Sequence, residues 1–99
     1  MPVQHIALFR FTSATAPATI DRALDDLRRL AKVIPGITDF TCGTNNSPEG
    51  LSEGLTHGFV MTFVNAAARD AYLPHAEHQK FIAFALPHVE KVVVFDFEC

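Results

Sequence analysis

The sequence predicts an α+β fold, in which a four-stranded antiparallel sheet carries helices on one face. Four segments have the β-branched and aromatic content of strands, and the regions between them have the residue spacing of helices. The predicted order is strand, helix, strand, strand, helix pair, strand. With 99 residues, 48% of them hydrophobic and 19% charged, the chain is expected to form one globular domain over residues 1–99.

The first strand, Val3–Phe11, is predicted to be apolar on both of its faces. His5 lies among bulky apolar residues on one face, whereas Ile6 and Leu8 lie on the other. A strand with one face in water would instead alternate between apolar and polar residues. This strand is therefore expected to be covered from both sides.

An amphipathic helix follows, with Thr15 as its predicted N-cap and Pro17 in its first turn. Its apolar residues recur at steps of three and four, and charged residues fill the remaining positions as a solvated face. The apolar set is Ile20, Ala23, Leu24, Leu27, Leu30, Ala31 and Ile34. The pair Pro35-Gly36 ends the helix.

The middle of the chain predicts two strands joined by a long loop. The weaker strand is Ile37–Thr44, and the stronger one is Leu55–Val64, where His57 shares a face with bulky apolar residues. The connecting segment, Thr44–Gly54, is rich in Asn, Ser, Pro and Gly, as loops are. A loop of this length is either a functional segment or a mobile hairpin connection.

Two short helices are predicted next. Asn65 is expected to cap a helix that runs to Tyr72, and Pro74 introduces a second helix over Ala76–Leu86. His78 lies in the first turn of the second helix, on the face of an apolar stripe formed by Phe81, Ile82 and Ala85. Burial and a helix N-terminus both disfavour imidazolium, so we expect a neutral imidazole that can accept a proton. The alternative is a core histidine bonded to backbone.

The last strand is predicted over His88–Glu98, after Pro87 has ended the helix. One face is expected to carry Val89, Val93, Phe95 and Phe97, and the opposite face Val92 and Val94. The helices can cover only one face of the sheet, so the second apolar face needs a partner. We therefore predict a homodimer joined sheet to sheet.

Charge and composition exclude several classes of function. The formal net charge is −3 and the basic residues are scattered, which gives no footprint for nucleic acid or an anionic membrane. No apolar run approaches the length of a membrane span, and no signal-peptide pattern opens the chain. Cys42 and Cys99 lack metal-ligand or redox spacing and are expected to be free thiols. The expected location is cytoplasmic.

The few polar side chains predicted to point inward suggest a small-molecule pocket. The first and third strands are normally central neighbours in this order of elements, so His5 and His57 are expected to lie side by side. If their face meets the helices, they point toward Tyr72 and His78 in an apolar cavity. Apolar walls with a few convergent polar groups are typical of ligand sites.

A metal site and a nucleophilic site are weaker alternatives. His75 and His78 are three residues apart, but HAEH differs from known histidine motifs, and no cysteine or acidic residue lies at a ligand spacing. We therefore predict no metal, and a metal-supported site stays the third hypothesis. Neither cysteine is near a histidine in the sequence, and no serine has the surroundings of a nucleophile elbow.

Several stretches of the chain resemble one known family. They are HIALFRF, IPGI, NSPEGLSEGLTHGFVMTF, AYLPHAEHQKF and VVVFDFE, which together extend over nearly the whole sequence. In these stretches the chain is similar to the stress-responsive A/B barrel domain family, also called Dabb. The resemblance implies a ferredoxin-like βαββαβ subunit that pairs into a dimeric α/β barrel, which agrees with the dimer predicted from the two-faced strands.

The same resemblance suggests an activity. The family includes plant stress-associated proteins and olivetolic acid cyclase, which closes a linear polyketide by aldol chemistry. The histidine and tyrosine that work in that cyclase match His78 and Tyr72 here, and His5 and His57 match histidines near its pocket. The pocket-facing positions of the first helix are plain leucines, Leu24 and Leu27, and no second tyrosine exists.

Two hypotheses follow. The first is a cofactor-independent enzyme acting on a hydrophobic carbonyl or phenolic molecule of polyketide type, with His78 as general base and Tyr72 as hydrogen-bond donor to the developing oxyanion. The substrate contacts would come from His5, His57, Leu24, Leu27 and Phe81. The second is a non-enzymatic stress-responsive dimer or a binder of small hydrophobic ligands, in which the histidines form a buried hydrogen-bond network.

Overall fold

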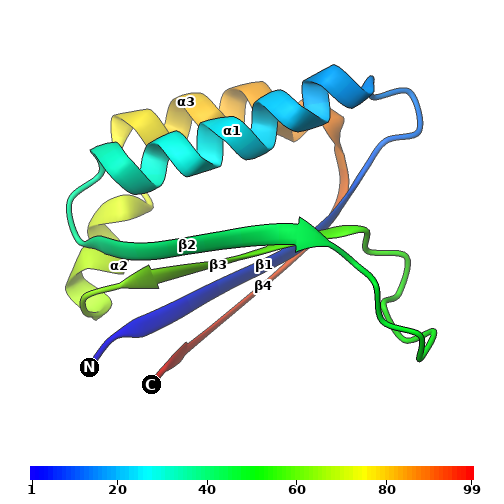
Figure 1. Ribbon diagram of the computed structural model, residues 1–99. Helices are drawn as coiled ribbons and strands as arrows, with labels where there is room; N and C mark the ends of the chain where they lie inside the picture. The colour runs from blue at the N-terminus through cyan, green and yellow to red at the C-terminus, as the bar shows by residue number, and fades with distance from the viewer.

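Four antiparallel strands form a single sheet in the order β2-β3-β1-β4, and helices cover one of its faces (Figure 1). The computed structural model describes all residues from 1 to 99. The elements are β1 (Val3–Phe11), α1 (Pro17–Val33), β2 (Ile37–Thr44), β3 (His57–Phe63), α2 (Ala66–Tyr72), α3 (Ala76–Ala85), the 3-10 turn η1 (Leu86–His88) and β4 (Val89–Glu98). This confirms the predicted α+β fold and the βαββαβ order.

Strand β1 lies at the centre of the sheet and fixes the register of its neighbours. Against β3, Val3 lies opposite Phe63 and Phe9 opposite His57. Against β4, His5 lies opposite Asp96. Strands β2 and β4 are the two edges. Helices α1 and α3 contact each other above the sheet, whereas α2 lies near the end of the sheet where both termini are found (Figure 1).

The hydrophobic core lies between the sheet and the helices. Alternate residues of β1 and β3 are buried on the side facing the helices, which we call the inner face. Helix α1 meets them with Ala23, Leu27 and Leu30, its three buried residues. Leu30, Met61 and Phe63 are completely inaccessible to solvent. The amphipathic pattern of α1 therefore has the orientation that its sequence predicted.

The opposite side of the sheet, the outer face, is also apolar but is uncovered in the single chain. Its exposed residues are Leu8, Val93, Phe95 and Phe97, beside the half-buried Ile6 and Val60. The exposed fraction is 41% for Leu8 and 65% for Phe95. The prediction that strands β1, β3 and β4 carry apolar side chains on both faces is thus confirmed.

The start of α1 differs from the prediction. Ala16 is the N-cap residue and makes no side-chain capping bond, although Pro17 occupies the first helical turn as expected. Thr15 is not the cap because its hydroxyl is 2.6 Å from the Thr12 hydroxyl and stabilises the preceding turn instead. Strand β3 likewise begins later than predicted, at His57, since Thr56 still belongs to the loop.

One residue of β4 faces the side opposite to the one predicted. Val89 packs against the core together with the inner face, not with Val93. The cause is an irregularity in the register, because Arg10 pairs with Lys91 but Phe11 pairs with Val89. The extra residue, Glu90, is a β-bulge, and it moves the side chain of the preceding Val89 to the opposite face of the sheet.

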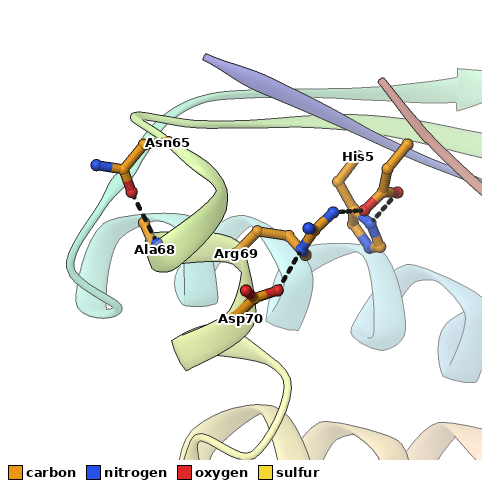
Figure 2. Close-up of polar contacts among 6 residues, drawn as sticks. His5, Asn65, Ala68, Arg69 and Asp70 are labelled. Atoms are coloured by element: carbon orange, nitrogen blue, oxygen red, sulfur yellow. Dashed lines mark hydrogen bonds and ion pairs between the residues drawn. The ribbon is translucent and has the colours of Figure 1, made fainter. Parts of the chain in front are cut away.

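Local signals at the other helix ends agree with the sequence. The Asn65 side chain accepts a hydrogen bond from the Ala68 N–H at 2.9 Å, which caps α2 (Figure 2). Gly36 ends the turn after α1 with φ +90, and an added Cβ there would lie 2.6 Å from the Ala68 Cβ. Helix α3 begins at Ala76 as predicted, with the His75 ring as its N-cap acceptor.

Neither α1 nor any of the shorter helices combines the length and apolar character needed to cross a lipid bilayer.

Candidate functional site

A cavity of about 340 Å³ lies between α3 and the inner face of the sheet. Its walls are aliphatic and aromatic side chains from β1, α1, α3 and β4, and Leu27 and Phe81 are among them. Three polar side chains interrupt these walls: His5, Tyr72 and His78. Leu73, Leu86, Val92 and Val94 line the cavity and are exposed, so the cavity has an apolar mouth, part of which is formed by the edge strand β4. This is the composition expected of a small-molecule site.

Tyr72 and His78 form a stacked pair at one side of the cavity. Their ring centroids are 4.0 Å apart and the ring planes are inclined by 28°. Tyr72 is the last residue of α2 and His78 lies in the first turn of α3. The short segment between these helices therefore places a hydroxyl and an imidazole in one wall of the cavity.

The hydrogen bonding of His78 defines its tautomer. Its Nδ1 donates to the Leu73 carbonyl at 3.0 Å, because a carbonyl oxygen can only accept. Nε2 of the neutral ring therefore has no proton and can accept one. Burial lowers the pKa of His78, although its bond to the Leu73 carbonyl acts in the opposite direction. A base is thus present at neutral pH.

The Tyr72 hydroxyl is a donor that no protein group uses. Tyr72 is 1% exposed, and burial raises the pKa of its phenol well above the ordinary value, so the hydroxyl keeps its proton. No sealed side-chain oxygen or nitrogen lacks a hydrogen-bond partner. The Tyr72 hydroxyl has no protein partner and is therefore not sealed, and Tyr72 is one of the residues that line the cavity.

His5 is held by a chain of charged groups that crosses three elements. Its Nδ1 lies 2.7 Å from one carboxylate oxygen of Asp96, and the other oxygen accepts from Arg69 at 2.7 Å. Arg69 also donates to Asp70 at 2.8 Å. Figure 2 shows the arginine reaching from α2 toward His5. The His5 ring packs edge-on against Tyr72, with centroids 5.9 Å apart.

Two of the predicted contact residues lie outside the cavity wall. His57 shares the inner face with His5, but it pairs with Phe9, four residues further along β1, so the two imidazoles are not side by side. Its ring lies against Phe9 and Phe11 and bonds the Thr56 hydroxyl. Leu24 packs against the core, about 100° around α1 from the cavity-lining Ala23.

A second hollow, of about 760 Å³, lies beside the β2–β3 loop and the outer face. It is larger than the inner cavity, but its titratable residues, Cys42, Glu49, Glu53, His57 and Lys91, form no stacked or hydrogen-bonded side-chain pair with one another, whereas Tyr72 and His78 do stack. No three His, Cys, Asp or Glu side chains come together as a metal-binding group. The inner cavity is therefore the candidate site.

Asp96 and Arg69 do not line the cavity, but they hold His5, which does, and the sequence did not suggest this contact. In isolation Asp96 is one charge near the end of a strand, and Arg69 is one charge in a short helix. The spacing in β4 was a usable signal, because Asp96 lies two residues after Val94 and four after Val92 and therefore on the same face of the strand. A carboxylate on a half-buried apolar face needs a charged or donor partner.

Fold and site together define a ferredoxin-like α+β protein with an apolar cavity between the sheet and the helices, into whose wall a few polar side chains are set. Residues 3–99 match the Dabb family, described as the stress responsive A/B barrel domain, and the chain belongs to this family. The stress-response A/B barrel domain-containing protein HS1 of Arabidopsis thaliana is 31% identical over 97 residues, which are 98% of this chain and 89% of that protein.

Two solved structures extend the comparison. A hydroxynitrile lyase from Passiflora edulis is 26% identical with a TM-score of 0.91, over 97% of this chain and 91% of that one. A ferredoxin-like protein of unknown function from Jannaschia sp., described as dimeric, is 30% identical with a TM-score of 0.88, over the whole of both chains. The fold is thus shared with an enzyme and with a dimer of unknown function.

Proposed function

We propose that this protein is a cofactor-independent acid–base catalyst for a hydrophobic carbonyl compound, with His78 as general base and Tyr72 as the donor to the carbonyl oxygen. The observation that carries the proposal is the hydrogen bond from His78 Nδ1 to the Leu73 carbonyl. It leaves Nε2 as a proton acceptor in a wall that also holds a protonated phenol. A base and an oxygen donor side by side are what enolate formation requires.

The proposed reaction begins with a proton transfer. His78 Nε2 accepts a proton from the carbon next to a carbonyl, and the electron pair of the C–H bond moves toward the carbonyl oxygen. Tyr72 donates a hydrogen bond to this oxygen as it gains negative charge. The enolate carbon can then attack a second carbonyl of the same molecule, whose C=O π electrons move to its oxygen as the new C–C bond forms. The protonated His78 returns its proton to this alkoxide, which completes an aldol cyclisation of the polyketide cyclase type and restores the base.

The hydroxynitrile lyase from Passiflora edulis offers support from a related chemistry. A hydroxynitrile is the addition product of hydrogen cyanide and a carbonyl compound, so its cleavage also needs a base for the hydroxyl proton.

The walls of the cavity determine which hydrophobic groups of the ligand can bind. Leu27 and Phe81 offer apolar contact, and His5 offers one further polar contact. His57 and Leu24 lie outside this wall and take no part in the proposal.

The working form of the protein is proposed to be a homodimer joined through the outer faces. Exposed Leu8, Phe95 and Phe97 make that face an apolar patch of the kind that marks an interface. The Jannaschia relative is described as dimeric.

The two cysteines are free thiols, which suits a reducing compartment such as the cytoplasm.

The second candidate function is binding without chemistry, as a stress-responsive protein that holds a small hydrophobic ligand. The apolar mouth formed by Leu86, Val92 and Val94 favours it, because an apolar molecule could enter whether or not a reaction follows. In this case the histidines would only stabilise the fold. Turnover separates the two candidates.

The test combines an assay with a binding measurement. The purified protein is incubated with β-keto thioesters, phenols and aromatic hydroxynitriles, and the imidazole signals are followed by NMR. We expect at least one carbonyl compound to be converted, and His78 signals to move when it binds. Binding without conversion of any compound would support the second candidate. Neither binding nor conversion would overturn both.

A further inference from the structure

A chain of hydrogen bonds runs from Arg69 through Asp96 to His5, which lines the cavity. Each carboxylate oxygen of Asp96 has one partner, His5 Nδ1 on one side and Arg69 Nη1 on the other, both at 2.7 Å. The three side chains come from β1, β4 and α2, which are distant in sequence. His5 is 6% exposed, whereas Asp96 and Arg69 are shielded but in contact with solvent.

The carboxylate fixes the tautomer of His5. A carboxylate only accepts, so the proton of the neutral His5 ring lies on Nδ1 and Nε2 is left as an acceptor. The ring cannot turn freely, since Phe59, Phe63 and Tyr72 surround it with centroids at 5.7, 6.0 and 5.9 Å. His5 itself lines the cavity.

Arg69 holds the carboxylate in turn. Its guanidinium bridges Asp70 and Asp96, and the hydrogen bonds to these two carboxylates raise the pKa of Arg69 above its ordinary value. The arginine therefore stays cationic, and it restrains the rotation of the Asp96 carboxylate. Asp70 uses the other side of the same guanidinium and does not touch His5.

We propose that Asp96 and Arg69 are positioning residues, which hold His5 with an unprotonated Nε2 so that it receives a hydrogen bond from a hydroxyl or enol group of the ligand. This proposal rests on the proposed function of the cavity and narrows its ligand class. An acceptor nitrogen binds an O–H group and gives nothing to a carbonyl oxygen, for which Tyr72 is the donor. The ligand then carries both a carbonyl and an O–H group.

The first test is the tautomer of His5, read from the ¹⁵N shifts of its ring nitrogens. We expect the neutral His5 ring of the wild-type protein to carry its proton on Nδ1 and none on Nε2. Asp96→Ala should produce a mixture of tautomers, and Arg69→Gln should broaden or shift the Nδ1–H signal. Asp70→Asn is the matched control, because it removes the other carboxylate on Arg69 and should leave the His5 spectrum unchanged.

The second test compares two probes that differ only in the O–H group, 4-propylphenol and 4-propylanisole. It is made in the His78→Asn background, so that the other imidazole cannot receive the phenol. We expect the phenol to bind about five- to tenfold more tightly than the ether. Adding Asp96→Ala should remove this preference while leaving the affinity for the ether unchanged.

The outcomes separate this proposal from the proposed function. A wild-type His5 with its proton on Nε2, or equal affinity for the two probes, would overturn the positioning role. Both readouts are independent of turnover, so they can succeed even if no substrate is converted. If Asp96→Ala does not fold, the wild-type tautomer and the Arg69→Gln spectrum still decide the question.

Discussion

The rings of Tyr72 and His78 stack with their centroids 4.0 Å apart, although the two residues belong to different helices. The backbone between the helices makes this contact possible, since the Leu73 carbonyl accepts from His78 at 3.0 Å and from Gln79 at 2.8 Å. The pair is therefore built from a local segment. The cavity that it serves is built from strands β1 and β4, far away in the sequence.

Replacing His78 by Asn should lower turnover by about 10²–10⁴-fold, the usual contribution of a general base. The Asn side chain can still donate to the Leu73 carbonyl, so α3 should keep its place while the acceptor Nε2 is lost. His88→Asn is the control, because His88 packs near Phe84 and does not line the cavity. Equal turnover of the two variants would contradict the proposed role.

Tyr72→Phe should lower turnover while leaving the stability of the fold nearly unchanged. The ring remains in the core, and the hydroxyl has no protein partner to leave behind, so the free energy of unfolding should change by less than about 1 kcal/mol. Turnover should fall by about 10²–10³-fold, as expected when one oxyanion donor is removed. Denaturant unfolding and steady-state kinetics on the same preparation check both statements. A stable variant with full activity would exclude Tyr72 as the donor.

Acid should destabilise the protein below about pH 6.5, the ordinary pKa of histidine. Burial lowers the pKa of His78 and of His57 in the folded state, so the unfolded chain binds more protons in this range. The stabilisation is complete above pH 6.5 and is lost as the pH falls from that value through the lowered pKa values. Urea unfolding from pH 7.5 to 5 should show the loss. His78→Asn should have a flatter profile, and an identical one would contradict the lowered pKa of His78.

Phe95→Lys should dissociate the proposed dimer. Phe95 is 65% exposed on the outer face, where a charge would be buried by a second copy. Val33→Lys is the matched control, because Val33 is 50% exposed at the end of α1, on the other side of the sheet. Sedimentation should give a monomer for the first variant and a dimer for the second. A wild-type monomer at micromolar concentration would remove the dimer altogether.

Asn65→Ala should cost about 1 kcal/mol in the free energy of unfolding, the typical value of a lost N-cap. The capping bond to the Ala68 N–H starts the helix that carries both Arg69 and Tyr72. Thermal unfolding against Asn46→Ala, an exposed loop position, measures the difference. No difference between the two would mean that α2 is held by packing alone.

Local patterns predicted the elements well. The bounds of β1 and β2 agree with the structure, as do the cap at Asn65 and the start of α3 at Ala76. These features depend on residues close in sequence, such as apolar periodicity or a side chain that reaches its own backbone. Thr15 failed as a cap because its hydroxyl has a competing partner in Thr12, which a sequence pattern does not reveal.

The site was only partly predictable, because the register of two paired strands depends on both strands and cannot be inferred from the sequence of either one. The helix-borne pair, Tyr72 and His78, was found from one short motif, and it lies in the cavity. His57 was expected beside His5, yet the β1–β3 register separates them along the sheet. Asp96 was missed for the same reason, since its contact with His5 depends on how β4 pairs with β1.

The contact between His5 and Asp96 also bears on how the edge strand finds its place. Strand β4 directs Val92 and Val94 into the cavity, and Val93, Phe95 and Phe97 to the other side. Both stripes are apolar, so hydrophobicity alone discriminates poorly between the correct pairing and a slip by one residue. A slip would expel Asp96 to the apolar outer face and leave His5 without its partner. The hydrogen bond between His5 and Asp96 therefore favours the pairing in which Val92, Val94 and Asp96 face the helices over the pairing slipped by one residue.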